Sequence, residues 1–172
     1  MPAIIKGASF GRGSYISPGY DFFRISLKGL NTGDNVLIGR NAWITILRPG
    51  VIIKIGSGTN IGRNVTITSA KGVSIGKKCL LSYNVSLLDH DHLVSDPEIS
   101  PMDGLITEGK NIVIGDDCFI GAHSFILKGV TLGQHCVVAA NSVVTKSFPD
   151  YSVIGGNPAV LIKNLKEAKK SV

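Results

Sequence analysis

Two aspartates and two histidines alternate in one short segment of the chain, as Asp89, His90, Asp91 and His92. Imidazole has an ordinary pKa near neutral pH, and a neighbouring carboxylate can fix its tautomer and stabilise the imidazolium. This pattern favours a general base, a group that removes the proton of a reacting hydroxyl. Two other interpretations stay open: a solvated polar loop that holds these residues by chance, and a metal site.

The spacing of the histidines argues against the metal site. The chain has four histidines, His90, His92, His123 and His135. Beyond the first two they are far apart in the sequence, and they offer no spacing typical of a histidine metal centre. We therefore expect no metal ligands here.

The segment that carries these residues has an unusual charge. Residues 89–109 hold two of the four histidines, six of the twelve acidic residues and no Lys or Arg, so the rest of the chain carries eighteen basic against six acidic residues. Loops of this length in a compact domain are usually functional or disordered. We expect a loop over about 89–111 that leaves the body of the protein and helps to bind a substrate. Because the loop is acidic, it favours a neutral, hydroxylated substrate.

A repeat of six residues runs on both sides of this loop. An aliphatic residue, often followed by glycine, recurs every six positions, at Ile55, Ile61 and Ile67 and again at Ile114, Ile120, Ile126, Leu132, Val138 and Val144. The period is neither that of a helix nor that of an amphipathic strand. It is typical of short strands joined by tight turns, each strand being one side of a triangular coil. The sequence predicts an all-β fold, a left-handed parallel β-helix; a β-sandwich would not keep so strict a phase.

The remaining segments are expected to complete one domain over residues 1–172. Residues 1–35 are less regular and suggest an N-terminal coil or cap, with the β-helix over 36–157. Apolar residues at helical spacing follow Pro158, which predicts a C-terminal helix over 158–172.

The cysteines, the N-terminal sequence and the net charge indicate the compartment and the kind of ligand to expect. Cys79, Cys118 and Cys136 share the inward register of the repeat, so we expect reduced core thiols in a reducing compartment. The N-terminus lacks the pattern of a signal peptide, and no stretch is long enough to span a membrane, so we expect a cytoplasmic protein. The net charge of +6 comes from scattered Lys and Arg, with no basic helix and no aromatic interleaving of the kind that binds nucleic acid. A small polyphosphate ligand and a solvated basic surface would each explain the excess.

The repeat region resembles a known family, the hexapeptide-repeat acyltransferases, in the branch of maltose, galactoside, nodulation-type and polysaccharide O-acetyltransferases. The likeness covers residues 36–163 and is most specific in 114–122, 128–133, 139–146 and 155–159. It implies a homotrimer with active sites between neighbouring prisms, acetyl-CoA bound in the groove between subunits, and a histidine base at the root of the extruded loop.

The resemblance also assigns residues. The family's base falls five residues after Leu87, at His92, with His90 as the alternative and better suited to orienting the substrate or its neighbour. The residues expected to bind the acceptor are Asn84, Asp89, His90 and Asp91. The residues expected to bind the CoA donor are Phe119, Gly121, Ala122, Ala140, Thr145, Lys146, Pro158 and Lys163.

The resemblance implies an acetyl-CoA-dependent O-acetyltransferase, and we expect it to act on a sugar hydroxyl of a surface polysaccharide or its precursor. We expect direct transfer, because the three cysteines point inward and cannot form an acyl-enzyme. Two alternatives remain: acetylation of a small molecule such as serine or an antibiotic, and a catalytically silent β-helix that serves as a scaffold.

Overall fold

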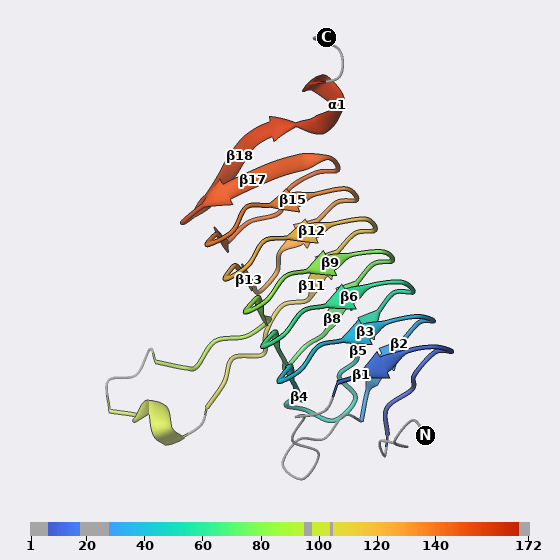
Figure 1. Ribbon diagram of the computed structural model, residues 1–172. Coiled ribbons are helices and arrows are strands. Elements are labelled where there is room, and N and C mark those ends of the chain that lie inside the picture. Colours follow the sequence, from blue (N-terminus) through green and yellow to red (C-terminus); the bar gives the residue numbers. More distant parts are fainter. Residues whose placement is uncertain (1–6, 18–27, 95–97, 104, 169–172) are drawn as a thin grey trace.

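The computed structural model describes residues 7–17, 28–94, 98–103 and 105–168. Over these ranges the chain forms the left-handed parallel β-helix that the repeat predicts. Its coils stack from the N-terminal end at the bottom of Figure 1 to the C-terminal end at the top, and one loop projects sideways. No helix within these ranges is long and apolar enough to cross a membrane.

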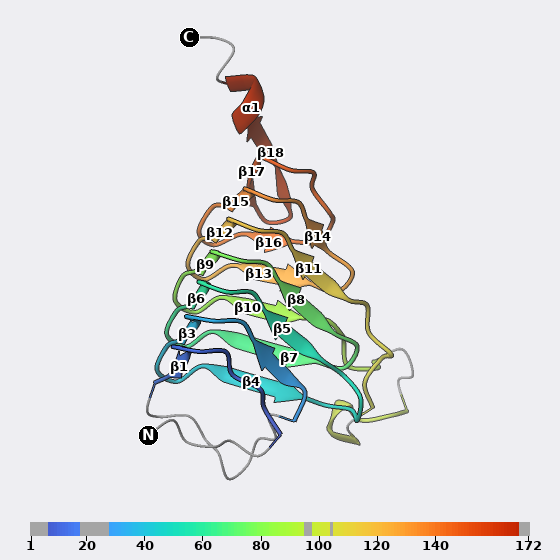
Figure 2. The ribbon, with the colours of Figure 1, turned by 90° about the vertical axis from the view of Figure 1, so that its right-hand side faces the viewer.

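The described strands form three sheets, which are the three faces of a triangular prism (Figure 2). Sheet I contains β1 (Tyr15–Ile16), β3 (Leu37–Ile38), β6 (Asn60–Ile61), β9 (Leu80–Leu81), β12 (Phe119–Ile120), β15 (Val137–Val138), β17 (Ser152–Gly156) and β18 (Ala159–Asn164). Sheet II contains β4 (Trp43–Ile46), β7 (Thr66–Ser69), β10 (Ser86–Leu88), β13 (Phe125–Leu127) and β16 (Val143–Val144). Sheet III contains β2 (Leu30–Thr32), β5 (Ile53–Ile55), β8 (Val73–Ile75), β11 (Ile112–Ile114) and β14 (Thr131–Leu132).

The aliphatic residues of the repeat fill the prism as stacked columns. In sheet I, for example, Ile61 pairs in register with Leu81, which pairs with Ile120 on the next coil, and all three are fully buried. Burying one such side chain contributes about 1.5–3 kcal/mol relative to leaving it exposed. Since each coil contacts mainly its two neighbours, the columns hold the stack together.

The three cysteines are free and buried, in agreement with the inward register. Their thiols donate to backbone carbonyls of the following coil: Cys79 to Gly115 at 3.1 Å, Cys118 to Gly133 at 3.1 Å and Cys136 to Pro149 at 3.2 Å. The cysteines therefore bind backbone carbonyls at one corner of the prism and have a structural role.

Acidic side chains cap one corner of the prism, the one between sheets III and I. The backbone N–H of Lys77 donates to Asp116 Oδ1 at 2.7 Å, and that of Gln134 donates to Asp150 Oδ1 at 3.0 Å. In each pair the carboxylate belongs to the coil that follows. A side chain of one coil thus accepts the N–H that the turn of the preceding coil leaves without a backbone partner.

Within the described residues, the predicted C-terminal helix is wrong over 158–164. Residues Ala159–Asn164 form β18, which pairs antiparallel with β17, and the helix α1 covers only Leu165–Ala168. No further coil follows β17 within the described chain, so its edge is open, and pairing with β18 satisfies its backbone groups. Val160 and Ile162 are β-branched and favour the strand.

The β-helix also begins earlier than residue 36. Strand β1 pairs with β3, and β2 pairs with β5, so both belong to the stack. Other parts of the expected N-terminal cap lie outside the described residues. Strand β10 ends at Leu88 and β11 begins at Ile112, and the described part of the chain between them lies outside the three sheets.

Candidate active site

Asp89 is the first residue of the loop, and its side chain points into the prism. Leu87 is buried and Leu88 faces outward, so the alternation of a strand turns Asp89 inward, where it is fully buried. An unpaired buried carboxylate would be very costly. The surroundings of Asp89 must therefore stabilise its charge.

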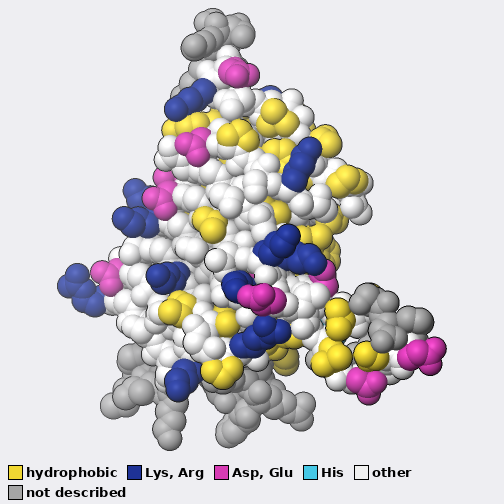
Figure 3. Space-filling model, turned by 180° about the vertical axis from the view of Figure 1, so that it is seen from behind, with side chains coloured by type: hydrophobic (Ala, Val, Ile, Leu, Met, Phe, Trp, Pro, Cys, Tyr) yellow, Lys and Arg dark blue, Asp and Glu magenta, His cyan; other side chains and the backbone are white. Residues whose placement is uncertain are grey.

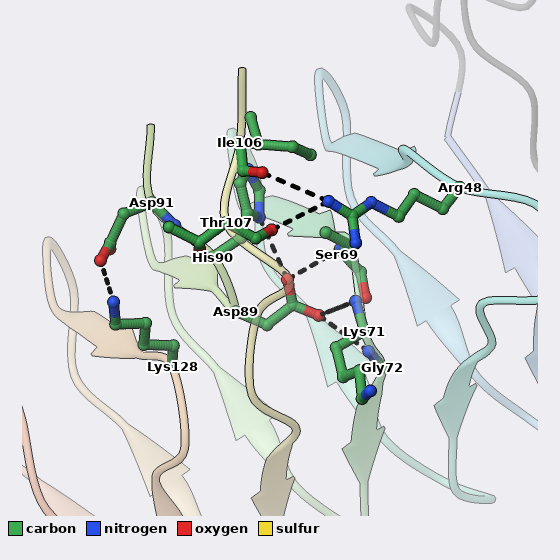
Figure 4. A network of polar contacts seen from close by, with 11 residues as sticks. Arg48, Ser69, Lys71, Gly72, Asp89, His90, Asp91, Ile106, Thr107 and Lys128 are labelled. Atoms are coloured by element: carbon green, nitrogen blue, oxygen red, sulfur yellow. Dashed lines mark hydrogen bonds and ion pairs between the residues drawn. The ribbon is translucent and has the colours of Figure 1, made fainter. Parts of the chain in front are cut away.

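The turn of the preceding coil supplies the partners of this carboxylate (Figure 4). The backbone N–H groups of Ala70, Lys71 and Gly72 donate to it at 2.8, 2.9 and 2.8 Å, and the Ser69 hydroxyl donates at 2.6 Å. Burial would raise the pKa of Asp89, but these hydrogen bonds outweigh burial, so its pKa lies below the ordinary value. The carboxylate is ionised at neutral pH.

His90 is oriented by this carboxylate. Its Nδ1 lies 3.1 Å from Asp89 Oδ1, and its side chain is only 8% exposed. An ionised carboxylate can only accept, so the proton of neutral His90 is on Nδ1 and its Nε2 is left as an acceptor. Asp89 thus fixes both the ring position and the tautomer of His90.

The two stems of the loop are tied to the prism by charged side chains. Asp91 on the outgoing stem pairs with Lys128 of the following coil, and Glu108 on the returning stem pairs with Lys71 of the preceding coil. The hydrogen bond and charge of Lys71 hold the pKa of Glu108 below its ordinary value. Figure 3 shows Lys and Arg side chains over the face beside the loop, with acidic side chains among them.

Arg48 holds the returning stem from a second side. Its Nη2 donates to the carbonyls of Ile106 and Thr107 at 3.3 and 3.1 Å. The contacts above show that the carboxylates of Asp89, Asp91 and Glu108 are engaged within the protein. This narrows the expectation that the acids of the loop face the acceptor.

His92 lies further out on the same stem. Its backbone forms an antiparallel bridge with Ile106, and its side chain is exposed. The flanking hydrogen bonds, Leu93 N–H to Leu105 and Thr107 N–H to Asp91, both at 2.9 Å, make this part of the loop a short two-stranded ribbon. The ring of His92 is thus accessible to substrate, on a segment of defined backbone.

The structure separates Asn84 from the other residues expected to bind the acceptor. Asn84 precedes β10, whereas residues 89–92 follow it, so the two groups lie at opposite ends of one strand. Asn84 has a positive φ of 58° and its Nδ2 is 3.3 Å from Nε2 of His123 on the next coil. Within one chain Asn84 and His92 are not brought together.

The residues expected to bind CoA fall into groups on the coils beyond the loop (Figure 1). Gly121, Ala122 and Ala140 lie at the corner between sheets I and II, where Ala122 is stacked beneath the Ala140 coil, since its carbonyl accepts the N–H of Asn141 at 2.9 Å. Thr145 and Lys146 lie at the next corner. Pro158 and Lys163 lie on the terminal hairpin, and Phe119 lies on the outer face of sheet I.

Sequence reasoning missed the residues that support the loop: Ser69, Lys71, Arg48 and Lys128. One signal could have found the first two. Continuing the alternation from buried Leu87 turns Asp89 inward, and a buried carboxylate needs donors from the coil that precedes it. The contacts of Arg48 and Lys128 have no such signal, because they join segments far apart in the sequence.

Comparisons with known proteins agree with this architecture. The family described as the hexapeptide repeat of succinyl-transferase matches residues 52–88 and 111–146, on both sides of the loop. The Escherichia coli (strain K12) protein WbbJ, which carries the name of a lipopolysaccharide biosynthesis O-acetyl transferase, is 32% identical over 148 residues, 82% of this chain and 74% of WbbJ. Galactoside O-acetyltransferase of the same organism is 34% identical over 143 residues, 77% of this chain and 66% of that protein.

A solved structure is similar as well. The hexapeptide-repeat acetyltransferase VCA0836 of Vibrio cholerae, complexed with acetyl-CoA, superimposes with a TM-score of 0.59 and is 27% identical, covering 91% of this chain and 70% of that one.

Proposed function

Because the chain belongs to the hexapeptide-repeat acetyltransferases, we propose that it transfers an acetyl group from acetyl-CoA to a sugar hydroxyl of a surface polysaccharide or its precursor. The observation that carries the proposal is the anchored Asp89–His90 pair, which leads into the exposed His92 on an acetyltransferase scaffold. The acceptor class follows from the two relatives whose names specify lipopolysaccharide and galactoside.

In the proposed mechanism His92 is the general base. It removes the proton of the acceptor hydroxyl as that oxygen attacks the thioester carbonyl, and the C–S bond then breaks. The imidazolium returns the proton to the leaving CoA sulfur. No covalent enzyme intermediate is needed, which agrees with the buried cysteines.

The test is thiol release from acetyl-CoA, measured with a series of hydroxylated acceptors. We expect release that depends on a saccharide acceptor, together with an acetyl ester in the product. Release only with serine or with an antibiotic would identify a small-molecule acetyltransferase. No release with any acceptor, and no binding of acetyl-CoA, would favour the scaffold and contradict the proposal.

The donor is polyanionic, so its binding should depend on charge. We expect Lys163→Ala to raise the KM for acetyl-CoA about twofold to fivefold, the scale of an exposed ion pair, and added salt to raise the wild-type KM as well. Lys54→Ala, which removes a lysine from the outer face of sheet III, is the control and should leave KM unchanged. An unchanged KM in Lys163→Ala removes this residue from the donor site.

We also propose that the protein is a homotrimer, as its family resemblance implies. The outer face of sheet I supports association, because Tyr15, Leu37, Leu80 and Phe119 form an apolar column on it and are 39–52% exposed. Leu37 and Leu80 flank Asn60, the polar member of the column within these strands. Apolar surface of this kind is buried when copies associate.

Light scattering should give a mass of three times the 18.2 kDa chain at micromolar concentration. Leu80→Glu places a charge in the middle of the apolar column and should lower that mass, whereas Lys54→Glu on sheet III should not. A stable wild-type monomer would contradict both the trimer and a site shared between subunits.

A further inference from the structure

The loop opens one corner of the prism, and a side chain closes that corner. In the coil that precedes it, the chain passes from β7 to β8 through residues 70–72. The stacked coil has no turn at this level, because the chain leaves at Asp89 and returns at Lys110. The N–H groups of Ala70, Lys71 and Gly72 therefore have the Asp89 carboxylate as their acceptor in place of the backbone of a stacked turn.

We propose that Asp89 is a positioning residue for acetyl transfer: its carboxylate replaces the missing corner and, through His90, fixes the stem that carries His92. The inference has two parts, and only the effect of Asp89 on the rate of acetyl transfer rests on the proposed function. The effect of Asp89 on the structure of the stem is independent of that function.

Both oxygens of Asp89 must be acceptors. Oδ1 accepts from Ala70 N–H and from His90 Nδ1, and Oδ2 accepts from Ser69, Lys71 and Gly72. An asparagine would turn an NH₂ group toward backbone N–H donors in either orientation of its amide, so neither orientation satisfies the turn. The site thus requires a carboxylate, and it gains the strength of charge-assisted hydrogen bonds.

The backbone of Asp89 joins both stems of the loop. Its carbonyl accepts the N–H of Lys110 at 2.8 Å, so the outgoing and returning stems meet at this residue. The pairing continues outward through Thr107 N–H to Asp91 and through the bridge of His92 with Ile106. A displacement at Asp89 would therefore be transmitted along the ribbon to His92, and small displacements of reacting groups have large effects on rate.

His90 links the anchored carboxylate to this ribbon through Nδ1. The side-chain nitrogen of asparagine can occupy the position of Nδ1, whereas the amide of glutamine reaches the position of Nε2. His90→Asn therefore keeps the link to Asp89 and removes Nε2, and His90→Gln does the opposite. This pair of variants separates a positioning role of His90 from direct chemistry at Nε2.

The test combines rates with amide hydrogen exchange. We expect Asp89→Asn and His90→Gln to lower kcat about tenfold to a hundredfold, with the KM for acetyl-CoA unchanged, and His90→Asn to lower kcat less than about threefold. Amides of 70–72 should exchange faster in Asp89→Asn, and amides of 106–107 faster in Asp89→Asn and His90→Gln but not in His90→Asn. Asp103→Asn, the same substitution at an exposed loop carboxylate, is the matched control and should match the wild type.

Two outcomes overturn the inference. If His90→Asn loses as much activity as His90→Gln, Nε2 takes part in the chemistry and the link to Asp89 does not explain the role of His90. If exchange at 70–72 and 106–107 is the same in all variants, Asp89 does not fix the stem. The exchange experiment needs no acceptor, so it decides the positioning role even if the wild type transfers no acetyl group, the result that would contradict the proposed function instead.

Discussion

His92→Ala should lower kcat for acetyl transfer by about a hundredfold or more, the scale of losing a general base. The KM for acetyl-CoA should change little, because His92 is expected to contact the acceptor hydroxyl and the reacting carbonyl rather than the nucleotide. The structure supports this assignment by exposing the ring on a ribbon of defined backbone. Steady-state rates at saturating acetyl-CoA measure the effect.

The control for this variant is His135→Ala. His135 stacks on Tyr151 at 5.0 Å between ring centroids, at the corner between sheets III and I, away from the loop. Its loss should leave kcat within about twofold. If His92→Ala keeps its activity and His90→Ala loses it, His90 is the base and the proposed assignment is wrong.

Gly121→Ala should lower the free energy of unfolding by about 3 kcal/mol, at the upper end of the cost of overpacking. A Cβ at this position would lie 2.5 Å from the backbone nitrogen of Ala140 and 2.8 Å from the carbonyl oxygen of Val138. These are backbone atoms of the next coil, so neither can move without shifting the stack. Thermal or denaturant unfolding without ligand measures the loss.

Gly58→Asn is the control. Gly121 is a glycine because a side chain would have no space, whereas Gly58 is a glycine with a positive φ and space around it. Gly58 has a positive φ of 73°, and a Cβ there would meet only Lys78 Cγ at 3.5 Å. Asn35 and Lys78, on the coils before and after it, already hold positive φ at this corner. This variant should be as stable as the wild type. A Gly121→Ala protein of unchanged stability would show that the coils tolerate a wider spacing than their backbone hydrogen bonds indicate.

The fold could be predicted from the sequence because the pattern of buried residues in a β-helix repeats over short segments of the chain. Each coil repeats the same positions, so the phase of Ile114, Ile120 and Ile126 states directly which side chains point inward and where each turn falls. The break in that phase located the loop for the same reason. The inward cysteines followed from the register alone.

The ends of the stack could not be predicted in this way. The apolar residues after Pro158 fit a helix by spacing, but the edge of β17 is open and captures them as β18. Whether residues 159–164 form a strand or a helix depends on the backbone groups at the edge of β17. The spacing of apolar residues in 159–164 carries no information about that edge. At the other end, β1 and β2 lack a clear phase and are held in the stack by pairing with β3 and β5.

In the candidate site, too, some features follow from the sequence and others only from the tertiary structure. The sequence by itself determined that His90 and His92 stand between carboxylates at the root of a loop, because these residues are neighbours in the chain. Only the tertiary structure decided that Asp89 is buried and held by Ser69 and the turn after it, and that Arg48, Lys71 and Lys128 hold the stems. The stacking of coils brings together residues about twenty to sixty positions apart, and the strength of a buried carboxylate's hydrogen bonds depends on that geometry rather than on its neighbours in sequence.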